Sequence, residues 1–366
     1  MTFLNRRTLV MGAASLASSN ALAVAFAQPS KEGLATIAAK ADIIYGAAAA
    51  REIFVDESYR KLYLNETKAL TTDYALKFDA LRQEEDKYQF EGADALVEFA
   101  AANKLLMRGH TLVWNENSPA WLNTKSKAEI GKVLDEHIDK VASRYKGRIN
   151  IWDVVNEPFW PGHNAQGAYR KGVWYDALGK SYVARAFKRT AKIDPNAKLA
   201  INEAHTERSD ELGLTIRFGL LRLIDELQSA GITLHAIGLQ GHLQPQFPFD
   251  DAGYVKFLEQ IAARKLEIHI TELDIDDSTY MGSVSSRDKQ AAERVYAFLS
   301  HVLSVPNVKM VSTWQLSDRY SWYSDADVLK KSGATRTPRP LPFDADMMKK
   351  PMYFAIERAL SERKNM

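Results

Sequence analysis

Two glutamates, Glu157 and Glu272, have the surroundings expected of a catalytic carboxylate pair. Each lies just beyond a β-branched, strand-like run, Ile149–Val155 for the first and Leu266–Thr271 for the second. A carboxylate is rarely tolerated at the end of a buried strand unless it has a partner or a task. Two carboxyl groups that face one another across a site are what the hydrolysis of a glycosidic bond requires.

Strand-like and helix-like segments alternate along the chain around these glutamates. The predicted strands are short and apolar: Ala41–Ala47, Leu62–Thr67, Leu105–Val113, Ile149–Val155, Lys198–Asn202, Ala236–Gln240, Leu266–Thr271 and Met310–Trp314. Apolar residues at three- and four-residue steps predict helices between them, as in Ala93–Ala102, Leu212–Leu227, Val295–Val302 and Met352–Leu360. This alternation predicts an α/β protein whose strands and helices form a closed (β/α)8 TIM barrel.

The rival architecture is a doubly wound open sheet. Such a sheet normally carries a glycine-rich phosphate turn after its first strand. Here the segment Tyr45-Gly46-Ala47-Ala48 holds a single glycine, which favours the barrel. The segment Asp325–Pro342 is charged and has no clear period, so we expect a long loop there.

In a barrel, functional side chains gather at the C-terminal ends of the strands. Polar groups and tryptophans follow several predicted strands: His110, Trp114, Asn202, Glu203, Gln240, His242, Trp314 and Trp322. Carboxylates and amides bind hydroxyls, and flat indoles cover the apolar faces of sugar rings. Two further tryptophans, Trp152 and Trp174, are expected in the core.

A metal-dependent hydrolase is a competing class on the same fold. Its site would need a His-x-His pair or several His and Asp residues aimed at one point. The histidines near the predicted strands are isolated, no His-x-His occurs, and the chain has no cysteine. We therefore predict neither a metal nor another cofactor.

The first residues have the features of an export signal. Two adjacent arginines, Arg6 and Arg7, precede an apolar stretch, Met11 to Ala25, and Ala25-Phe26-Ala27 has the small-x-small pattern of a cleavage site. This pattern predicts a twin-arginine signal over residues 1–27 and a single catalytic domain over 28–366. We expect the mature protein in the periplasm or outside the cell.

The net charge narrows the classes of binding partner. The chain has 48 basic and 46 acidic residues, and this nearly balanced charge does not favour binding to nucleic acid or to an anionic membrane. A monomer that binds a neutral saccharide is the expectation.

Several motifs in this order resemble those of glycoside hydrolase family 10, the barrel xylanases. They are spread over the mature chain: Gly109-His110-Thr111-Leu112-Val113-Trp114, Trp152 through Pro158, Gly238-Leu239-Gln240-Gly241-His242, Ile270 through Asp274, Thr313-Trp314 through Trp322, and Arg339 through Asp344. Each motif is short, but the first five in the right order and spacing are highly specific.

The resemblance implies an endo-1,4-β-xylanase that retains the anomeric configuration. Glu272 would attack the anomeric carbon, and Glu157 would act first as the acid and then as the base. The remaining roles implied by the resemblance are supporting ones. Asn156 would hold the sugar 2-hydroxyl. His242 would hydrogen-bond Glu272 and keep it ionised, and Asp274 would orient His242. Trp314 and Trp322 would enclose the sugar, and the glycone side would be completed by Lys77, His110, Trp114 and Gln240.

The chain departs from the family pattern at three places. Asn115 stands where the family usually has His, Asp73-Tyr74 replaces a Glu-Asn pair that holds the next sugar, and Gln315 replaces a glycine. The Asp73-Tyr74 change keeps open a related glycosidase that acts on another β-linked glucan or on short xylo-oligosaccharides. A non-catalytic carbohydrate-binding barrel would have lost one glutamate or its neighbours, and both are present.

Overall fold

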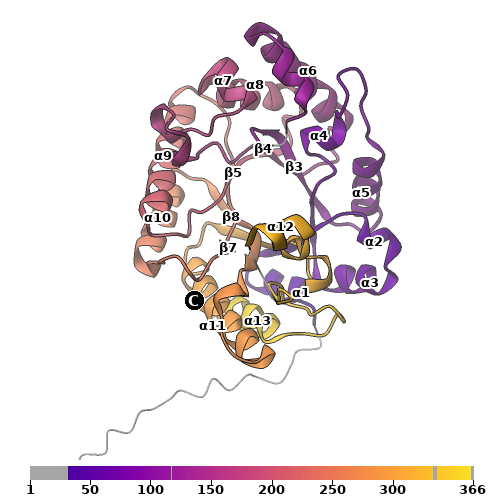
Figure 1. The fold of residues 1–366 in the computed structure, drawn as a ribbon, viewed down its shortest axis with the longest axis vertical. Coiled ribbons are helices and arrows are strands. Elements are labelled where there is room, and N and C mark those ends of the chain that lie inside the picture. Colours follow the sequence, from indigo (N-terminus) through magenta and orange to yellow (C-terminus); the bar gives the residue numbers. More distant parts are fainter. Residues whose placement is uncertain (1–31, 117, 333–335, 364–366) are drawn as a thin grey trace, which may run out of the picture. The chain divides into compact units, whose positions relative to one another are not determined.

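A closed ring of parallel strands organises residues 32–116, 118–332 and 336–363, which are the parts of the chain that the computed structural model describes (Figure 1). Neighbouring strands pair in parallel around the ring, and β6 pairs with β8 to close it. The ring consists of β1 (Ile44–Ala49), β2 (Ala69–Thr72), β3 (Leu106–Trp114), β4 (Ile151–Asn156), β5 (Lys198–Glu203), β6 (Ala236–Leu239), β8 (Glu267–Ile275) and β9 (Val308–Thr313). A two-residue strand, β7 (His242–Leu243), pairs in parallel with the C-terminal end of β8. The predicted (β/α)8 barrel is confirmed.

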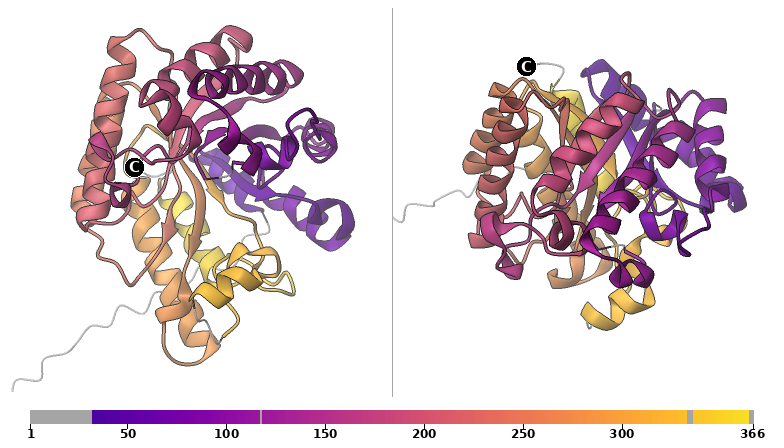
Figure 2. Two further views of the ribbon diagram at one scale, coloured as in Figure 1. Left: turned by 45° about the horizontal axis from the view of Figure 1, so that its top comes forward. Right: turned by 90° about the horizontal axis from the view of Figure 1, so that it is seen from above.

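Helices cover the outside of the strands (Figure 2). They are α1 (Leu34–Lys40), α2 (Glu52–Val55), α3 (Glu57–Glu66), α4 (Phe78–Leu81), α5 (Glu91–Ala102), α6 (Lys127–Arg144), α7 (Val173–Leu178), α8 (Ser181–Ile193), α9 (Glu211–Ser229), α10 (Asp251–Ala263), α11 (Val284–Val302), α12 (Ala326–Ser332) and α13 (Pro351–Arg363). Each of the four helices predicted from apolar spacing is present, within α5, α9, α11 and α13. None of the described helices is long and apolar enough to span a bilayer.

Side-chain caps set where several helices begin. Ser126 and Glu129 form a reciprocal capping box at the start of α6, and Asp210 and Ser283 accept backbone N–H groups at the starts of α9 and α11. Such caps satisfy donors that the first helical turn leaves unpaired. They place the loops that enter these helices next to the C-terminal ends of the strands.

The prediction of a strand at Leu62–Thr67 is wrong. Most of this segment belongs to α3, whose first turn is capped by Asp56 through the backbone N–H groups of Ser58 and Tyr59, at 2.9 and 3.0 Å. Two fully buried rings, Tyr59 and Tyr63, lie four residues apart and form the inner face of this helix. The true second strand, β2, begins after the helix and has only four residues.

Other boundaries also differ from the sequence-based expectation. The first strand begins and ends a few residues later than Ala41–Ala47, and helix α12 lies within the segment predicted as the loop Asp325–Pro342. The strand predicted at Leu266–Thr271 continues to Ile275, so Glu272 lies within β8 and not, as expected from the sequence, beyond its end. The core assignments of Trp152 and Trp174 are confirmed, since both side chains are fully buried. The export signal predicted for residues 1–27 lies outside the described residues.

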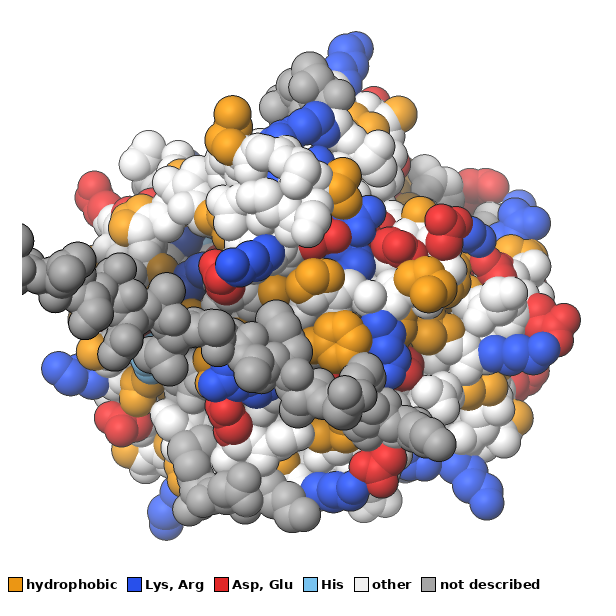
Figure 3. Space-filling view, turned by 90° about the horizontal axis from the view of Figure 1, so that it is seen from below, with side chains coloured by type: hydrophobic (Ala, Val, Ile, Leu, Met, Phe, Trp, Pro, Cys, Tyr) orange, Lys and Arg blue, Asp and Glu red, His pale blue; other side chains and the backbone are white. Residues whose placement is uncertain are grey.

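The surface carries both signs of charge. Figure 3 shows Lys and Arg side chains interspersed with Asp and Glu on one face, with apolar side chains scattered among them. This mixture agrees with the nearly equal numbers of basic and acidic residues in the sequence. Where side chains are described on the face drawn in Figure 3, basic and acidic groups lie interspersed and not in separate areas.

A layer of charged side chains fills the barrel between its lower end and the polar groups at its rim. The lower layer is apolar and comes from strands alone: Ala69, Ile151, Ala200, Ala236 and Met310. Next comes the ion pair of Arg108 with Asp153, and the guanidinium of Arg108 also contacts His269 Nδ1 at 3.0 Å. Both partners of the ion pair are fully buried.

Gly238 on β6 makes room for this layer. A Cβ atom at this position would lie 2.3 Å from Asn202 Oδ1 and 2.7 Å from Arg108 Nη2. An alanine here would therefore clash with both side chains. The glycine at the start of the Gly238–His242 motif is therefore explained by close packing inside the barrel.

We expect Asp153→Asn to destabilise the protein by about 3–5 kcal/mol, because it leaves the buried Arg108 charge unpaired. Burial would raise the pKa of Asp153, but the charge of Arg108 and the hydrogen bond to His110 outweigh burial and lower it. Denaturant unfolding followed by circular dichroism measures the change. Combining Asp153→Asn with Arg108→Met removes the unpaired charge and should recover part of the loss. An unfolding midpoint of Asp153→Asn equal to the wild type would contradict this account.

Candidate active site

Glu157 stands at the end of β4, in a backbone conformation that non-glycine residues seldom adopt. Its φ is +48°, its N–H donates to the carbonyl of Asn202 at 2.8 Å, and its own carbonyl accepts from Arg170 Nε at 3.0 Å. Its carboxylate accepts hydrogen bonds from Trp114 Nε1 at 3.2 Å and from Gln240 Nε2 at 2.8 Å. A left-handed backbone held from several sides is typical of a functional position.

Glu272, on β8, is more deeply buried and has a different support. Its carboxylate accepts from Asn202 Nδ2 at 2.7 Å and contacts His242 Nε2 at 3.1 Å. The other ring nitrogen of His242 lies 2.8 Å from Asp274 Oδ1. Asp274 follows two residues after Glu272 on the same strand, so both carboxylates face the histidine.

These contacts hold Glu272 ionised and His242 protonated. Burial alone would raise the pKa of Glu272, but the hydrogen bond from His242 and the charges of His110, His242 and Lys77 lower it. Burial likewise acts against the charge of His242, but Asp274 and Glu272 together raise its pKa well above the usual range. An ionised, fixed carboxylate is suited to act as a nucleophile.

A relay of amide groups joins the two glutamates. Gln240 Nε2, which donates to Glu157, also lies 3.5 Å from Asn156 Oδ1. Asn156 Oδ1 in turn accepts from Asn202 Nδ2 at 2.9 Å, and Asn202 donates to Glu272. The carboxyl groups therefore belong to one polar site, although 115 positions separate them in the sequence.

Tryptophans on one side of the site contact the support of Glu272. Trp322 Nε1 donates to Asp274 Oδ2 at 2.8 Å, and its ring centroid lies 5.5 Å from that of His242. Trp314 lies edge-on to both His242 and His110, with centroids 6.4 and 5.5 Å away. Trp322 remains 38% exposed, so part of its indole is available to a ligand.

Lys77 lies among three aromatic rings. Its ammonium is 5.1 Å from the ring centroid of Trp114, 5.8 Å from that of Trp314 and 5.9 Å from that of Tyr74. Cations are attracted to the faces of such rings. Lys77 thus joins the neighbourhood of the glutamates to the segment that follows β2.

The structure brings all the predicted site residues together at this end of the barrel. His110 Nδ1 lies 3.0 Å from Asp153 Oδ2, which connects the charged layer of the interior to the site. Within the described residues, no cluster of three or more His, Cys, Asp or Glu side chains is arranged to hold a metal ion.

Sequence reasoning missed a group of residues on the opposite side of Glu157. Arg170 Nη2 lies 3.0 Å from Glu157 Oε2, and Arg170 Nη1 forms an ion pair with Glu116. The Arg170 guanidinium lies 5.1 Å from the ring centroid of Trp160, which lies 5.7 Å from that of His205. Arg170 and Trp160 belong to the loop between β4 and α7, where no periodic pattern marks a residue as part of a site.

Burial shifts the pKa of two titratable side chains near Glu157, those of Glu203 and His205, toward the neutral form. Burial raises the pKa of Glu203 well above its usual range, and the charge of Glu157 adds to this, while Arg170 opposes it. Burial lowers the pKa of His205 to about 4, despite the nearby Glu157. Burial therefore favours the neutral form of both side chains, whereas Arg170 carries a positive charge next to Glu157.

Two of the three departures from the family pattern have a structural explanation. Asn115 Oδ1 accepts from the backbone N–H groups of Trp174 and Tyr175, at 3.2 and 3.4 Å, so it caps the start of α7. Gln315 has a φ of +77°, a conformation that favours glycine. Its amide accepts from Tyr59 OH at 2.7 Å and donates to Asp73 Oδ2 at 3.0 Å, which holds it in place.

Comparison with known proteins identifies relatives over nearly the whole chain. Residues 33–359 match the profile described as Glycosyl hydrolase family 10. Endo-1,4-beta-xylanase B of Thermotoga neapolitana is 32% identical over 335 residues, which are 90% of this chain and 92% of that protein. Endo-1,4-beta-xylanase C of Phanerodontia chrysosporium is 31% identical and covers 90% of this chain and 79% of its own length.

Solved structures show the same barrel. Native xylanase 10B from Thermotoga maritima superposes with a TM-score of 0.81 at 32% identity, covering 91% of this chain and 99% of its own. Xylanase 10B from Thermotoga petrophila, solved in complex with xylobiose, has the same TM-score and identity, covering 92% of this chain and all of its own.

We expect His242→Gln to raise the pKa of Glu272, because burial is then no longer opposed by the adjacent positive charge. The ionised form of Glu272 would then be lost at a higher pH as the solution is acidified. Carboxyl ¹³C NMR of protein labelled at glutamate follows this titration, and the spectrum of Glu272→Gln identifies the signal. His301→Gln, on the outer helix α11, is the matched control. A Glu272 titration that is identical in His242→Gln and in the control would contradict the expectation.

Proposed function

The chain belongs to glycosyl hydrolase family 10, and on this basis we propose that it is an endo-1,4-β-xylanase that retains the anomeric configuration. The observation that carries the proposal is the unequal support of the two glutamates. Glu272 is buried, has a lowered pKa and contacts the protonated His242, whereas Glu157 is surrounded by donors from three other segments. Retaining glycosidases need one carboxylate that is ionised when it attacks and one that exchanges a proton.

In the first step Glu272 attacks the anomeric carbon of a xylosyl unit. The bond to the leaving oxygen breaks, and that oxygen takes a proton from Glu157. The product is a covalent glycosyl-enzyme on Glu272. Asn202 and His242 hold the attacking carboxylate at 2.7 and 3.1 Å, so little reorientation is needed.

In the second step Glu157, now ionised, removes a proton from water, and the water oxygen replaces Glu272 at the anomeric carbon. Asn156 is suited to hold the sugar 2-hydroxyl, since its side chain lies between the two glutamates in the amide relay. We assign Lys77, His110, Trp114 and Gln240 to the glycone side, and Trp314 and Trp322 to the walls around the sugar.

The leaving-group side is assigned to the residues beyond Glu157. Trp160 offers a half-buried ring, and neutral His205 and the charged Arg170 lie beside it. An aromatic face next to hydrogen-bonding groups suits the sugar that departs.

A reducing-sugar assay on xylan, carboxymethyl cellulose and xylobiose separates a xylanase from an enzyme for another β-linked glucan or for short oligosaccharides.

We expect Glu272→Gln to abolish hydrolysis of all these substrates, because no other group can form the glycosyl-enzyme. Glu157→Gln should lower xylan hydrolysis by about 10²–10⁴-fold, the usual contribution of general acid–base catalysis. It should lower the first turnover of a 2,4-dinitrophenyl xylobioside much less, since that leaving group needs no proton.

Proton NMR of the first product tests the stereochemistry of the same reaction, and the β anomer should form first. Near-wild-type xylan hydrolysis by either variant would refute the assignment of the pair. An initial α anomer would refute retention while leaving the xylanase activity in place.

We further propose that residues 1–27 direct twin-arginine export and that residues 28–366 form the mature catalytic domain. The support is the Arg6–Arg7 pair, the apolar stretch after it and the Ala25-Phe26-Ala27 pattern. Replacing both arginines by lysine should leave the uncleaved protein inside the cell, as judged by fractionation and intact mass. Unchanged export of this variant would show that another route is used.

A further inference from the structure

A chain of hydrogen-bonding side chains runs up the inside of the barrel from its lower end. There Lys198 Nζ, at the start of β5, lies 2.6 and 2.7 Å from the two carboxylate oxygens of Glu267, at the start of β8. Glu267 Oε2 lies 3.1 Å from His269 Nε2, and His269 Nδ1 lies 3.0 Å from Arg108 Nη1. The charged layer below the site is therefore connected to the solvent-exposed lower end of the barrel.

The chemistry of its two partners fixes which nitrogen of His269 carries the proton. A guanidinium can only donate hydrogen bonds, so Nδ1, which faces Arg108, must be the bare nitrogen that accepts. A neutral imidazole then carries its proton on Nε2, which donates to the carboxylate of Glu267. Only the neutral Nε2–H tautomer satisfies both contacts, because a proton on Nδ1 would face a donor with a donor.

The surroundings of His269 favour this neutral form. Burial lowers the pKa of the imidazole, the hydrogen bond with Glu267 opposes this, and the positive charges of Arg108 and Lys198 add to it. The ring is only 2% exposed, so water does not readily replace the acceptor that it offers. His269 therefore presents a bare nitrogen to the guanidinium at neutral pH.

Arg108 depends on this acceptor for its alignment. The guanidinium is fully buried, and its Nε and Nη2 donate to the two carboxylate oxygens of Asp153, one each. Within the described residues, the only other acceptor near Nη1 is the sulfur of Met310, which is weak and 4.0 Å away. Without His269, a buried donor would lack a strong acceptor, which favours rotation of the guanidinium out of this position.

The aligned ion pair positions His110 in the site. Asp153 Oδ2 accepts from Arg108 Nε at 2.9 Å and lies 3.0 Å from His110 Nδ1. A carboxylate held by both prongs of a guanidinium has a fixed plane, so the imidazole that donates to it is fixed as well. This contact leaves Nε2 of His110 for a ligand, and the charge of His110 is one of those that lower the pKa of Glu272.

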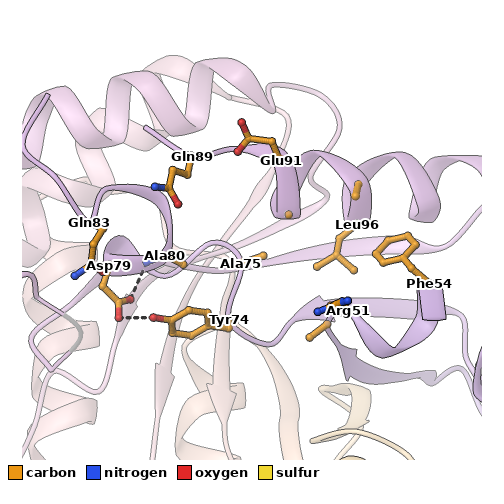
Figure 4. Close-up of a pocket in the computed structure, with 13 residues that line it drawn as sticks. Arg51, Phe54, Tyr74, Ala75, Asp79, Ala80, Gln83, Gln89, Glu91 and Leu96 are labelled. Atoms are coloured by element: carbon orange, nitrogen blue, oxygen red, sulfur yellow. Dashed lines mark hydrogen bonds between the residues drawn. The ribbon is translucent and has the colours of Figure 1, made fainter. Parts of the chain in front are cut away.

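This route reaches the site from below and not from its side. At the side, Tyr74 lies 5.9 Å from the ammonium of Lys77 and also lines a hollow, where its hydroxyl donates to Asp79 (Figure 4). All residues that line this hollow lie between positions 50 and 96, so none belongs to the interior chain. A substitution of His269 therefore leaves that lining unchanged.

We propose that His269 is a positioning residue of the catalytic site: its bare Nδ1 fixes the buried ion pair below the site, and the ion pair fixes His110. This inference rests on the proposed function, which assigns His110 to the glycone side. His269 touches no substrate and acts only through the side chains above it.

The test compares two substitutions of His269 in the full-length enzyme. His269→Leu removes the acceptor, whereas His269→Asn keeps an amide oxygen near the position of Nδ1. In His269→Leu the low-pH limb of the kcat/KM profile on xylohexaose should move upward by about one pH unit, the scale on which a nearby charge shifts a carboxyl pKa, because His110 is no longer held in place to lower the pKa of Glu272. His269→Asn should keep most of the wild-type profile.

His235→Leu is the matched control. His235 also lies at the lower end of the barrel, where its Nδ1 accepts from the backbone N–H of Leu199 at 2.9 Å, outside the interior chain. This variant should lower the temperature of thermal unfolding while leaving the low-pH limb in place. The control thus separates a loss of stability from a loss of positioning.

A low-pH limb that is unchanged in His269→Leu, or that moves equally in His269→Asn or His235→Leu, would overturn the positioning role. ¹⁵N NMR of histidine-labelled wild type reads the tautomer without any substrate, and the spectrum of His269→Asn identifies the signal. A proton on Nδ1 of His269 at pH 7 would also overturn the proposal. A wild type inactive on xylohexaose would refute the xylanase function, and ¹³C titration of Glu272 in the same variants would then decide on the positioning role.

Discussion

The site depends on a buried ion pair inside the barrel. Arg108 and Asp153 have no access to water, so each must find its partner within the interior. Arg108 also contacts His269, Asp153 also contacts His110, and the missing side chain of Gly238 leaves room for the guanidinium. Such a pair adds little net stability, but breaking it is costly, so it restricts how the side chains above it are arranged.

The two glutamates differ because different strands support them. Glu272 is contacted by Asn202 of β5 and His242 of β7, and His242 is held in turn by Asp274, which accepts from Trp322. Glu157 follows the end of its strand, in a left-handed conformation, and the loop between β4 and α7 contributes Arg170 to it. Under the proposed mechanism this contrast matches the two tasks, because the nucleophile must be ionised when it attacks, whereas the acid/base must give up a proton and take one back.

Sequence reasoning was strongest where parallel strands impose geometry. Strands of one barrel end on the same rim, so residues as far apart as His110, Gln240 and Trp314 could be expected together from their strand positions alone. It failed at α3, where the spacing of Tyr59 and Tyr63 was helical but the local composition resembled a strand. It also failed for residues such as Arg170, because a loop has no period from which to infer which side chain turns inward.

The contacts of Gln315 tie its backbone conformation to two other side chains. A left-handed backbone suits glycine, and here a glutamine holds φ +77° while its amide bonds to Tyr59 and Asp73. A substitution at any one of these three positions removes a hydrogen bond from another. The effects of such substitutions on stability should therefore be non-additive, since residues that share a hydrogen-bond network are energetically coupled.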